Sequence, residues 1–163
     1  MKKIPVVLAL TVLLSLSGCA VDEEALPDIA PSYAEDSTSE QETDEQGTTL
    51  VAVVVGDRTF EMRLYENETS EAFATLLPLT ITMDDLHANE KFYYLEEGLP
   101  SNALPVSEIN TGDLSLFGSD CLVLFYEDFA TSFSYTPIGS IDNPTELAEA
   151  VGSHGVEVSF RAQ

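Results

Sequence analysis

The chain has no tryptophan, two cysteines, two histidines, and six Lys and Arg residues against 29 Asp and Glu. Two cysteines cannot form a disulfide scaffold. Two of the six bases, Lys2 and Lys3, lie at the extreme N-terminus. Because phosphate binding needs clustered bases, this scarcity excludes nucleic acid as a partner. The acidity is typical of a well-solvated surface, and the alternative is that it selects a cationic ligand.

Motifs that carry chemistry are also missing. Neither His87 nor His154 has Cys, His or Asp residues at the spacings that are typical of a zinc site. The chain has no Gly-rich phosphate loop and no Ser-His-Asp order. The two acids of each acidic pair are adjacent in sequence, and adjacent residues on a strand point to opposite faces. Such pairs therefore do not indicate a shared catalytic site of two carboxylates. We therefore predict no metal, no cofactor and no catalytic residue, and we expect Cys121 to be a small buried hydrophobe.

The N-terminus lacks an apolar run long enough to span a membrane. Residues 4–15 are apolar but fall short of the ~20 residues that a spanning helix needs. A basic start followed by such a run is typical of a secretory signal. The run ends in Leu16-Ser17-Gly18-Cys19, which resembles the lipobox of bacterial lipoproteins. An ordinary secreted protein with a chance cysteine is the alternative.

The lipobox resemblance implies a signal peptide at 1–18 and acyl chains on Cys19 that hold the protein on a lipid bilayer. It places the protein in a bacterial cell envelope, facing outside the cytoplasm. Residues 20–48 contain ten acids and no Lys or Arg. Such a segment cannot bury enough apolar area to offset chain entropy, so we predict an acidic, disordered tether at 19–48.

The segment 49–163 reads as a folded domain with mostly alternating strands. We predict strands at 50–55, 59–65, 79–83, 91–95, 114–117, 121–126, 137–141 and 156–161. Gly56-Asp57 predicts a hairpin turn after the first. Phe60, Met62 and Leu64 should share one face of the second.

Two short helices are predicted between these strands. The first covers 67–77, with Phe73 and Leu77 on one face, and Pro78 ends it. The second covers 143–152, with Asn143 as N-cap and Gly152 at its end. The pattern predicts a mainly β domain, a small closed barrel of about eight strands capped by two short helices. Because 121–126 is apolar on both faces, it should lie under a helix and against the core.

The order of these elements resembles the cyclophilin family, and specifically a compact bacterial group of cyclophilin-like proteins. The matching stretches are Gly56-Asp-Arg-Thr-Phe-Glu-Met-Arg-Leu-Tyr-Glu-Asn67, the helix ending at Leu77, Gly118-Ser119, Pro137-Ile-Gly-Ser-Ile141 and Glu146-Leu-Ala-Glu-Ala-Val151. The resemblance covers about residues 50–163 and implies the cyclophilin barrel.

The same resemblance implies that the usual isomerase residues are missing. Cyclophilins place an arginine over the proline peptide bond, in a Phe-His-Arg sequence. The counterpart here is Phe92-Tyr93-Tyr94. Asp120 stands where the family has glutamine, Tyr135 stands where it has histidine, and the tryptophan is absent. Lys91 is the one base near the arginine position, on a face that the sequence leaves undetermined.

Aromatic residues at strand ends and in loops are the candidate ligand-binding residues: Tyr94, Phe117, Phe129, Phe133 and Tyr135. Such residues can line a shallow groove, and the alternative is that many of them belong to the core. We predict a membrane-anchored module that binds a peptide or small-molecule ligand without isomerase chemistry. The alternative is a peptidyl-prolyl cis-trans isomerase for exported proteins, with a tyrosine or Lys91 in place of the arginine.

Overall fold

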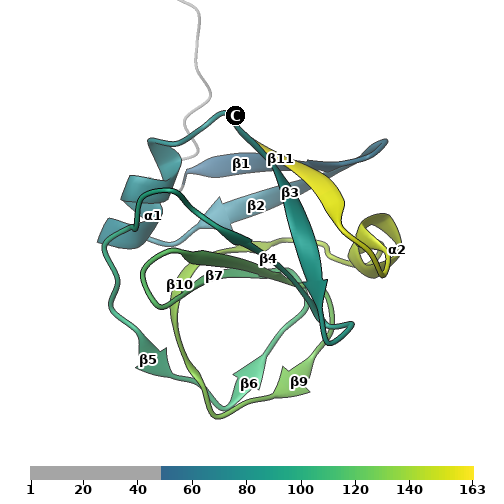
Figure 1. Ribbon diagram of the computed structural model, residues 1–163. Helices are drawn as coiled ribbons and strands as arrows, with labels where there is room; N and C mark the ends of the chain where they lie inside the picture. The colour runs from purple at the N-terminus through teal and green to yellow at the C-terminus, as the bar shows by residue number, and fades with distance from the viewer. Residues whose placement is uncertain (1–48) are drawn as a thin grey trace, which may run out of the picture. The chain divides into compact units, whose positions relative to one another are not determined.

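Eight antiparallel strands close into a barrel in the computed structural model, which describes residues 49–163 (Figure 1). In the order in which they neighbour one another, they are β2 (Arg58–Leu64), β1 (Leu50–Val55), β11 (Val156–Ala162), β3 (Leu79–Leu86), β4 (Glu90–Tyr94), β8 (Cys121–Phe125), β7 (Asp113–Phe117) and β10 (Ser134–Ile141). β10 pairs with β2 and closes the circle. This confirms the predicted mainly β barrel, whose closure removes the edge strands.

Alternating side chains fill the barrel interior. Phe60, Met62 and Leu64 of β2 are all buried, as their spacing predicts. Val51, Val53 and Val55 of β1 face the same core. The predicted turn at Gly56-Asp57 joins these two strands, and Gly56 has a φ of 60°, which glycine adopts without strain.

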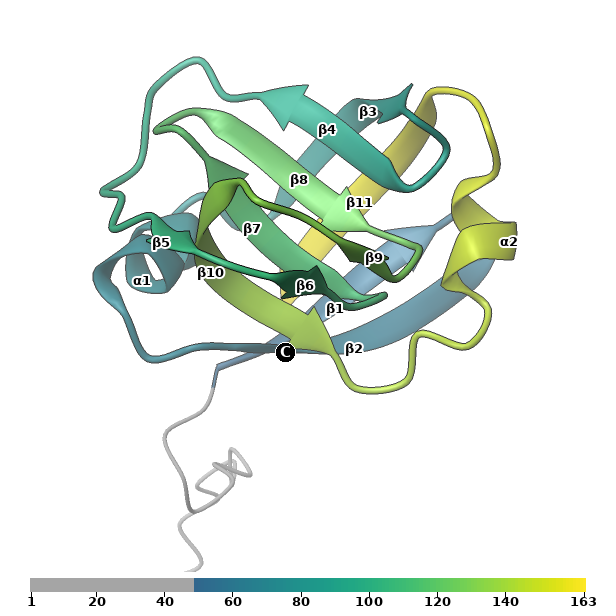
Figure 2. The same ribbon diagram turned by 90° about the horizontal axis from the view of Figure 1, so that it is seen from below.

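Two short helices lie at opposite ends of the barrel, α1 (Glu68–Ala74) and α2 (Leu147–Val151) (Figures 1 and 2). Phe73 of α1 is fully buried and packs edge-on against Phe160, with ring centroids 5.5 Å apart. Leu147 and Val151 of α2 enter the same core. The predicted helix caps of the barrel are therefore confirmed.

The helix bounds differ from the prediction for local reasons. α1 stops at Ala74, where the Thr75 hydroxyl donates to the Ala72 carbonyl and competes with the helical pattern. Asn143 was predicted to cap the second helix, but that helix starts at Leu147, with Glu146 as its cap residue. Asn143 instead accepts a hydrogen bond from the Thr145 hydroxyl at 2.6 Å. This local turn delays the first helical turn.

Three two-residue strands lie outside the barrel, and the sequence analysis assigned their residues to loops. They are β5 (Leu104–Pro105), β6 (Glu108–Ile109) and β9 (Phe129–Ala130). β6 pairs with β9, and Figure 2 shows the pair lying across β8, β7 and β10. The outer face of β8 is thus covered by Ile109 and Phe129, and the expectation of a helix over this face was wrong.

The signal peptide 1–18, Cys19 and the tether 19–48 lie outside the described residues, so those predictions stay predictions. Within 49–163, no helix has the length and apolar character needed to cross a membrane.

Candidate functional site

A groove of about 410 Å³ opens on the outer face of β4 and β8. We call it the aromatic groove. It is lined by Leu86, His87, Asn89, Glu90, Phe92, Tyr94, Phe117, Cys121, Val123, Phe133 and Tyr135. Its volume lies in the ~300–1,000 Å³ range typical of small-molecule sites.

Strand parity decides which residues reach this groove. Phe92 and Tyr94 point outward from β4, and Tyr93 between them packs against the barrel core. Cys121 and Val123 point outward from β8, where Val123 pairs with Phe92 and Cys121 with Tyr94. The floor of the groove is therefore the outer face of two paired strands.

Four of the five candidate residues meet in the groove, namely Tyr94, Phe117, Phe133 and Tyr135. Tyr94 belongs to β4, Phe117 ends β7, Phe133 lies in the loop between β9 and β10, and Tyr135 belongs to β10. Phe129 lies outside it and packs against Phe125, with ring centroids 5.7 Å apart. Sequence reasoning missed Leu86, His87, Asn89, Glu90 and Phe92, although the period of two relates Glu90 and Phe92 to Tyr94.

Three large aromatic side chains of the groove are exposed to solvent. Tyr94 is 62%, Phe133 59% and Phe117 44% exposed. Phe117 contacts Phe133 edge-on at 6.0 Å and Tyr135 at 5.6 Å, and Tyr135 packs on the buried Phe125. The rings are held in place by one another, yet their faces remain open. Contiguous exposed apolar patches are candidate interaction sites, and this one makes the groove the candidate site of the domain.

The polar groups of the groove include one carboxylate, that of Glu90, and one thiol, that of Cys121. Glu90 is partly buried, and burial raises the pKa of its carboxyl above 4.5 while His87 opposes the shift. The Asn89 side-chain oxygen is buried and has no hydrogen-bond partner. Burial also raises the pKa of the Cys121 thiol, which is free and inside the barrel wall as predicted. A protonated thiol is a poor nucleophile.

The rim of the groove is a turn in an uncommon conformation. His87 and Ala88, between β3 and β4, have φ values of 56° and 58°. Residues other than glycine adopt this region uncommonly, and His is more frequent there than Ala. The Asp85 carboxylate accepts a hydrogen bond from the Ala88 amide and helps to hold the turn. The turn fixes His87 and Asn89 beside Glu90 at one end of the groove.

Lys91 points away from the groove and into the barrel. It is fully buried, and its ammonium donates to the Asp85 carboxylate at 2.7 Å and to the His154 carbonyl at 2.8 Å. The Tyr126 hydroxyl donates to the same Asp85 oxygen at 2.6 Å. These bonds hold the pKa of Asp85 below its usual 3.8. Neither Lys91 nor any other Lys or Arg among the described residues lines the groove.

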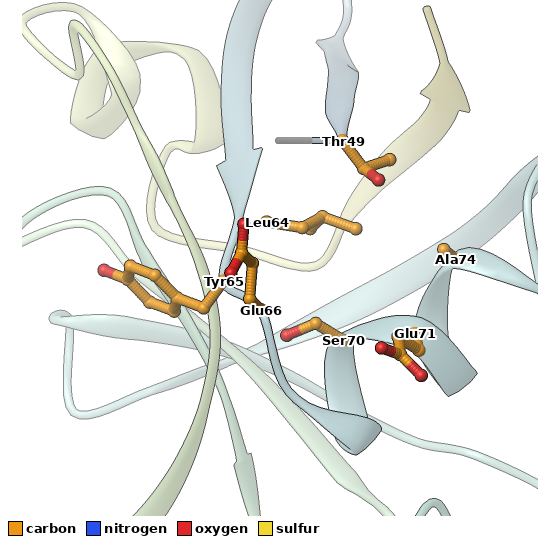
Figure 3. Close-up of a pocket in the computed structure, with 7 residues that line it drawn as sticks. All are labelled: Thr49, Leu64, Tyr65, Glu66, Ser70, Glu71 and Ala74. Carbon is orange, nitrogen blue, oxygen red and sulfur yellow. The ribbon is translucent and has the colours of Figure 1, made fainter. Parts of the chain in front are cut away.

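A second hollow, of about 320 Å³, lies beside α1 (Figure 3). It is lined by Thr49, Leu64, Tyr65, Glu66, Ser70, Glu71 and Ala74. The Ser70 hydroxyl is already engaged, donating to the Ile138 carbonyl at 2.7 Å, and Figure 3 shows the Tyr65 ring turned away from the helix. With two carboxylates and little apolar surface, this hollow is a weaker candidate. Residues 49–163 hold no group of three or more His, Cys, Asp or Glu that could bind a metal.

Known proteins resemble this chain in family and in fold. The family model described as "Cyclophilin-like family" matches residues 53–161. The solution structure of the hypothetical protein AF2241 from Archaeoglobus fulgidus has a TM-score of 0.57 and 20% identity, and the match covers 74% of this chain and 100% of that one. At this identity, the likeness shows the fold alone.

A weaker structural likeness is to McbB in complex with tryptophan. Its TM-score is 0.47 at 14% identity, over 68% of this chain and 44% of that one. Nothing is inferred from it. No curated protein matches the chain.

Proposed function

The chain belongs to the cyclophilin-like family, and from that premise we propose that it is an extracytoplasmic, lipid-anchored binding protein. Its aromatic groove holds a peptide or a small-molecule ligand, and it does so without catalysing proline isomerisation. The observation that carries this proposal is the open set of aromatic faces in the groove. Phe92 and Tyr94 of β4 supply two of them, and Phe117 at the end of β7, Phe133 in the loop after β9 and Tyr135 of β10 complete the set.

The groove chemistry suits binding better than isomerisation. Rotation about a peptide bond has a barrier of ~18–20 kcal/mol, and an enzyme lowers it by stabilising the twisted state. An arginine does this in cyclophilins by donating to the amide. The one base near that position, Lys91, has its ammonium inside the barrel on Asp85 and His154. Tyr94 is the remaining donor on this strand face, and a neutral hydroxyl is a weaker donor than a guanidinium.

The envelope location rests on the N-terminal sequence. A basic start, an apolar run at 4–15 and Leu16-Ser17-Gly18-Cys19 support export followed by acylation of Cys19. Each buried methylene of an acyl chain contributes ~0.8 kcal/mol, and more than one chain is needed for stable anchoring. The acidic residues of 20–48 favour an extended tether between the anchor and the barrel.

A titration with Pro-containing peptides tests the proposed function. The full-length chain in detergent micelles is titrated with a short apolar peptide library, and binding is followed through the Tyr fluorescence or the NMR signals of the groove. We expect saturable binding that weakens about tenfold or more in Tyr94→Ala, because this removes the most exposed ring. Tyr65→Ala is the matched control, since Tyr65 is likewise an exposed tyrosine, at 44%, but lies outside the groove.

The same peptides report on isomerisation. NMR exchange spectroscopy should give the same cis-trans rate with and without the protein. Acceleration at ordinary cyclophilin efficiency that is lost in Tyr94→Ala would replace the binding role with the isomerase alternative. Binding that is equal in Tyr94→Ala and Tyr65→Ala would place the ligand site outside the aromatic groove.

A further inference from the structure

At the polar end of the aromatic groove, Glu90 and Asn89 present acceptor oxygens beside the His87 ring. Glu90 makes no hydrogen bond or ion pair with the described residues, and the neighbouring Asn89 oxygen is buried and unpaired. A buried acceptor without a donor costs about 1–3 kcal/mol relative to a satisfied one. Other buried polar side chains of this domain are paired: Lys91, Thr69 and Ser70 each donate to a carboxylate or carbonyl oxygen. The unpaired Asn89 oxygen and the Glu90 carboxylate therefore lie together at the aromatic groove.

The rest of the groove presents aromatic faces. Phe92 and Tyr94 lie edge to face at 5.8 Å, beside Glu90 on the same face of β4. Phe117 and Phe133 complete the opposite wall. The negative face of an aromatic ring attracts a cation within about 6 Å of its centroid. Rings and carboxylate together thus favour one sign of charge.

The net negative charge of the domain also favours a positively charged ligand. Residues 49–163 hold nineteen Asp and Glu and only four Lys and Arg. Arg58 pairs with Glu146 and Glu149, Arg63 with Asp142, and Lys91 with Asp85. None of the four lines the groove. A cationic ligand would be attracted to this surface and an anionic one repelled.

We propose that the ligand of the aromatic groove carries a protonated amine or a guanidinium, seated on the aromatic faces with its N–H groups toward Glu90 and Asn89. This inference rests on the proposed binding function and names its ligand class. The cationic group can belong to a basic side chain of a peptide or to a free amine. An N–H donor satisfies the unpaired acceptors, which a neutral apolar ligand leaves unpaired.

Matched peptides test the inference. The full-length chain in detergent micelles is titrated with the acetylated, amidated peptide Gly-Leu-Lys-Leu-Gly and with the same peptide carrying N-ε-acetyl-lysine. We expect the charged peptide to bind about fivefold to twentyfold more tightly at low salt, with the difference shrinking at 0.5 M NaCl. Glu90→Gln should reduce the difference to less than twofold. Glu157→Gln on β11 is the matched control, because Glu157 is exposed and outside the groove.

The two proposals fail in distinguishable ways. Equal binding of both peptides that still depends on Tyr94 would overturn the cationic inference and leave the binding function intact. Absence of binding of either peptide at millimolar concentration would overturn both. Titration with n-butylammonium chloride separates the two sources: a Glu90-dependent affinity similar to that of the charged peptide assigns the site to a free amine, and an affinity at least tenfold weaker assigns it to a basic peptide.

Discussion

The role of Lys91 depends on the face of β4 from which its side chain points. Its neighbours Glu90 and Phe92 face the aromatic groove, whereas its own side chain points to the opposite face of the sheet. There it bonds to Asp85, its cross-strand partner on β3, and to the His154 carbonyl. The ammonium also lies 5.2 Å from the centroid of the Tyr126 ring. A fully buried cation is tolerated only when it is paired in this way. We therefore assign Lys91 to stability and not to ligand binding.

Replacing Lys91 tests this assignment. Lys91→Met should lower the free energy of unfolding by about 2 kcal/mol at pH 7, because the His154 carbonyl loses the ammonium donor and Asp85 keeps only the Tyr126 and Ala88 donors. The folded-state pKa of Asp85 is lowered, so the stabilisation that comes from the Lys91–Asp85 pair alone is present above pH 3.8 and is lost as the pH falls through the lower folded value. Urea unfolding followed by circular dichroism at pH 7 and at pH 2.5 measures both effects.

The matched control for Lys91 is Arg161→Met, which removes the same charge from an exposed position on β11. It should change the free energy of unfolding by no more than about 0.5 kcal/mol. Equal destabilisation by the two variants would mean that Lys91 contributes only through net charge. Ligand affinity should be the same in both, since neither side chain lines the groove.

At the scale of elements, the closure of the barrel depends on how closely β10 approaches β2. Gly139 is paired with Leu64, next to a shift in the register of β10 against β7. A Cβ atom at Gly139 would lie 2.5 Å from the Arg63 carbonyl oxygen, a distance that real Cβ atoms do not adopt. Because that oxygen belongs to the backbone, the strand itself would have to move.

Gly139→Ala should therefore destabilise the domain by about 2–3 kcal/mol. The measurement is the midpoint of urea unfolding, with hydrogen exchange on the β2–β10 pairs as a local readout. Gly155→Ala is the control, because its Cβ would meet the mobile end of the Asp84 side chain at 3.3 Å. If both substitutions have the same small effect, β10 and β2 are not closely packed at this seam.

The short pair β6–β9 outside the barrel was not predicted from the sequence. Barrel strands such as β1 and β2 follow from alternation, because each buries every second residue, and β8 follows from its continuous apolar run. The pair β6–β9 has two residues on each side, too few for any period to be visible. It forms because Ile109 and Phe129 cover the apolar outer face of β8, a contact between segments remote in the chain. No local pattern could have replaced the expected helix with this ribbon.

For the whole molecule, the proposed acylation of Cys19 would determine where the groove is located. Cys19→Ser should move the protein from the membrane to the soluble fraction, because the variant has no thiol to acylate. Fractionation of producing cells, with mass spectrometry of the mature N-terminus, measures this. Cys121→Ser is the control and should leave the partition unchanged, since Cys121 is buried in the barrel wall. An unmodified Cys19 in the mature protein would contradict the lipoprotein assignment.

The sequence by itself determined the barrel strands, the two helices, the acidic surface and the missing arginine. These properties are local or additive, and a period of two or a residue count reveals them. It also named four residues that line the groove, but it could not bring them together. Tyr94, Phe117, Phe133 and Tyr135 meet only because barrel closure and strand register place distant segments side by side. The tertiary structure likewise decided that Glu90 faces these rings and that Lys91 does not, because the register of β4 against β8 assigns each side chain to one face of the sheet.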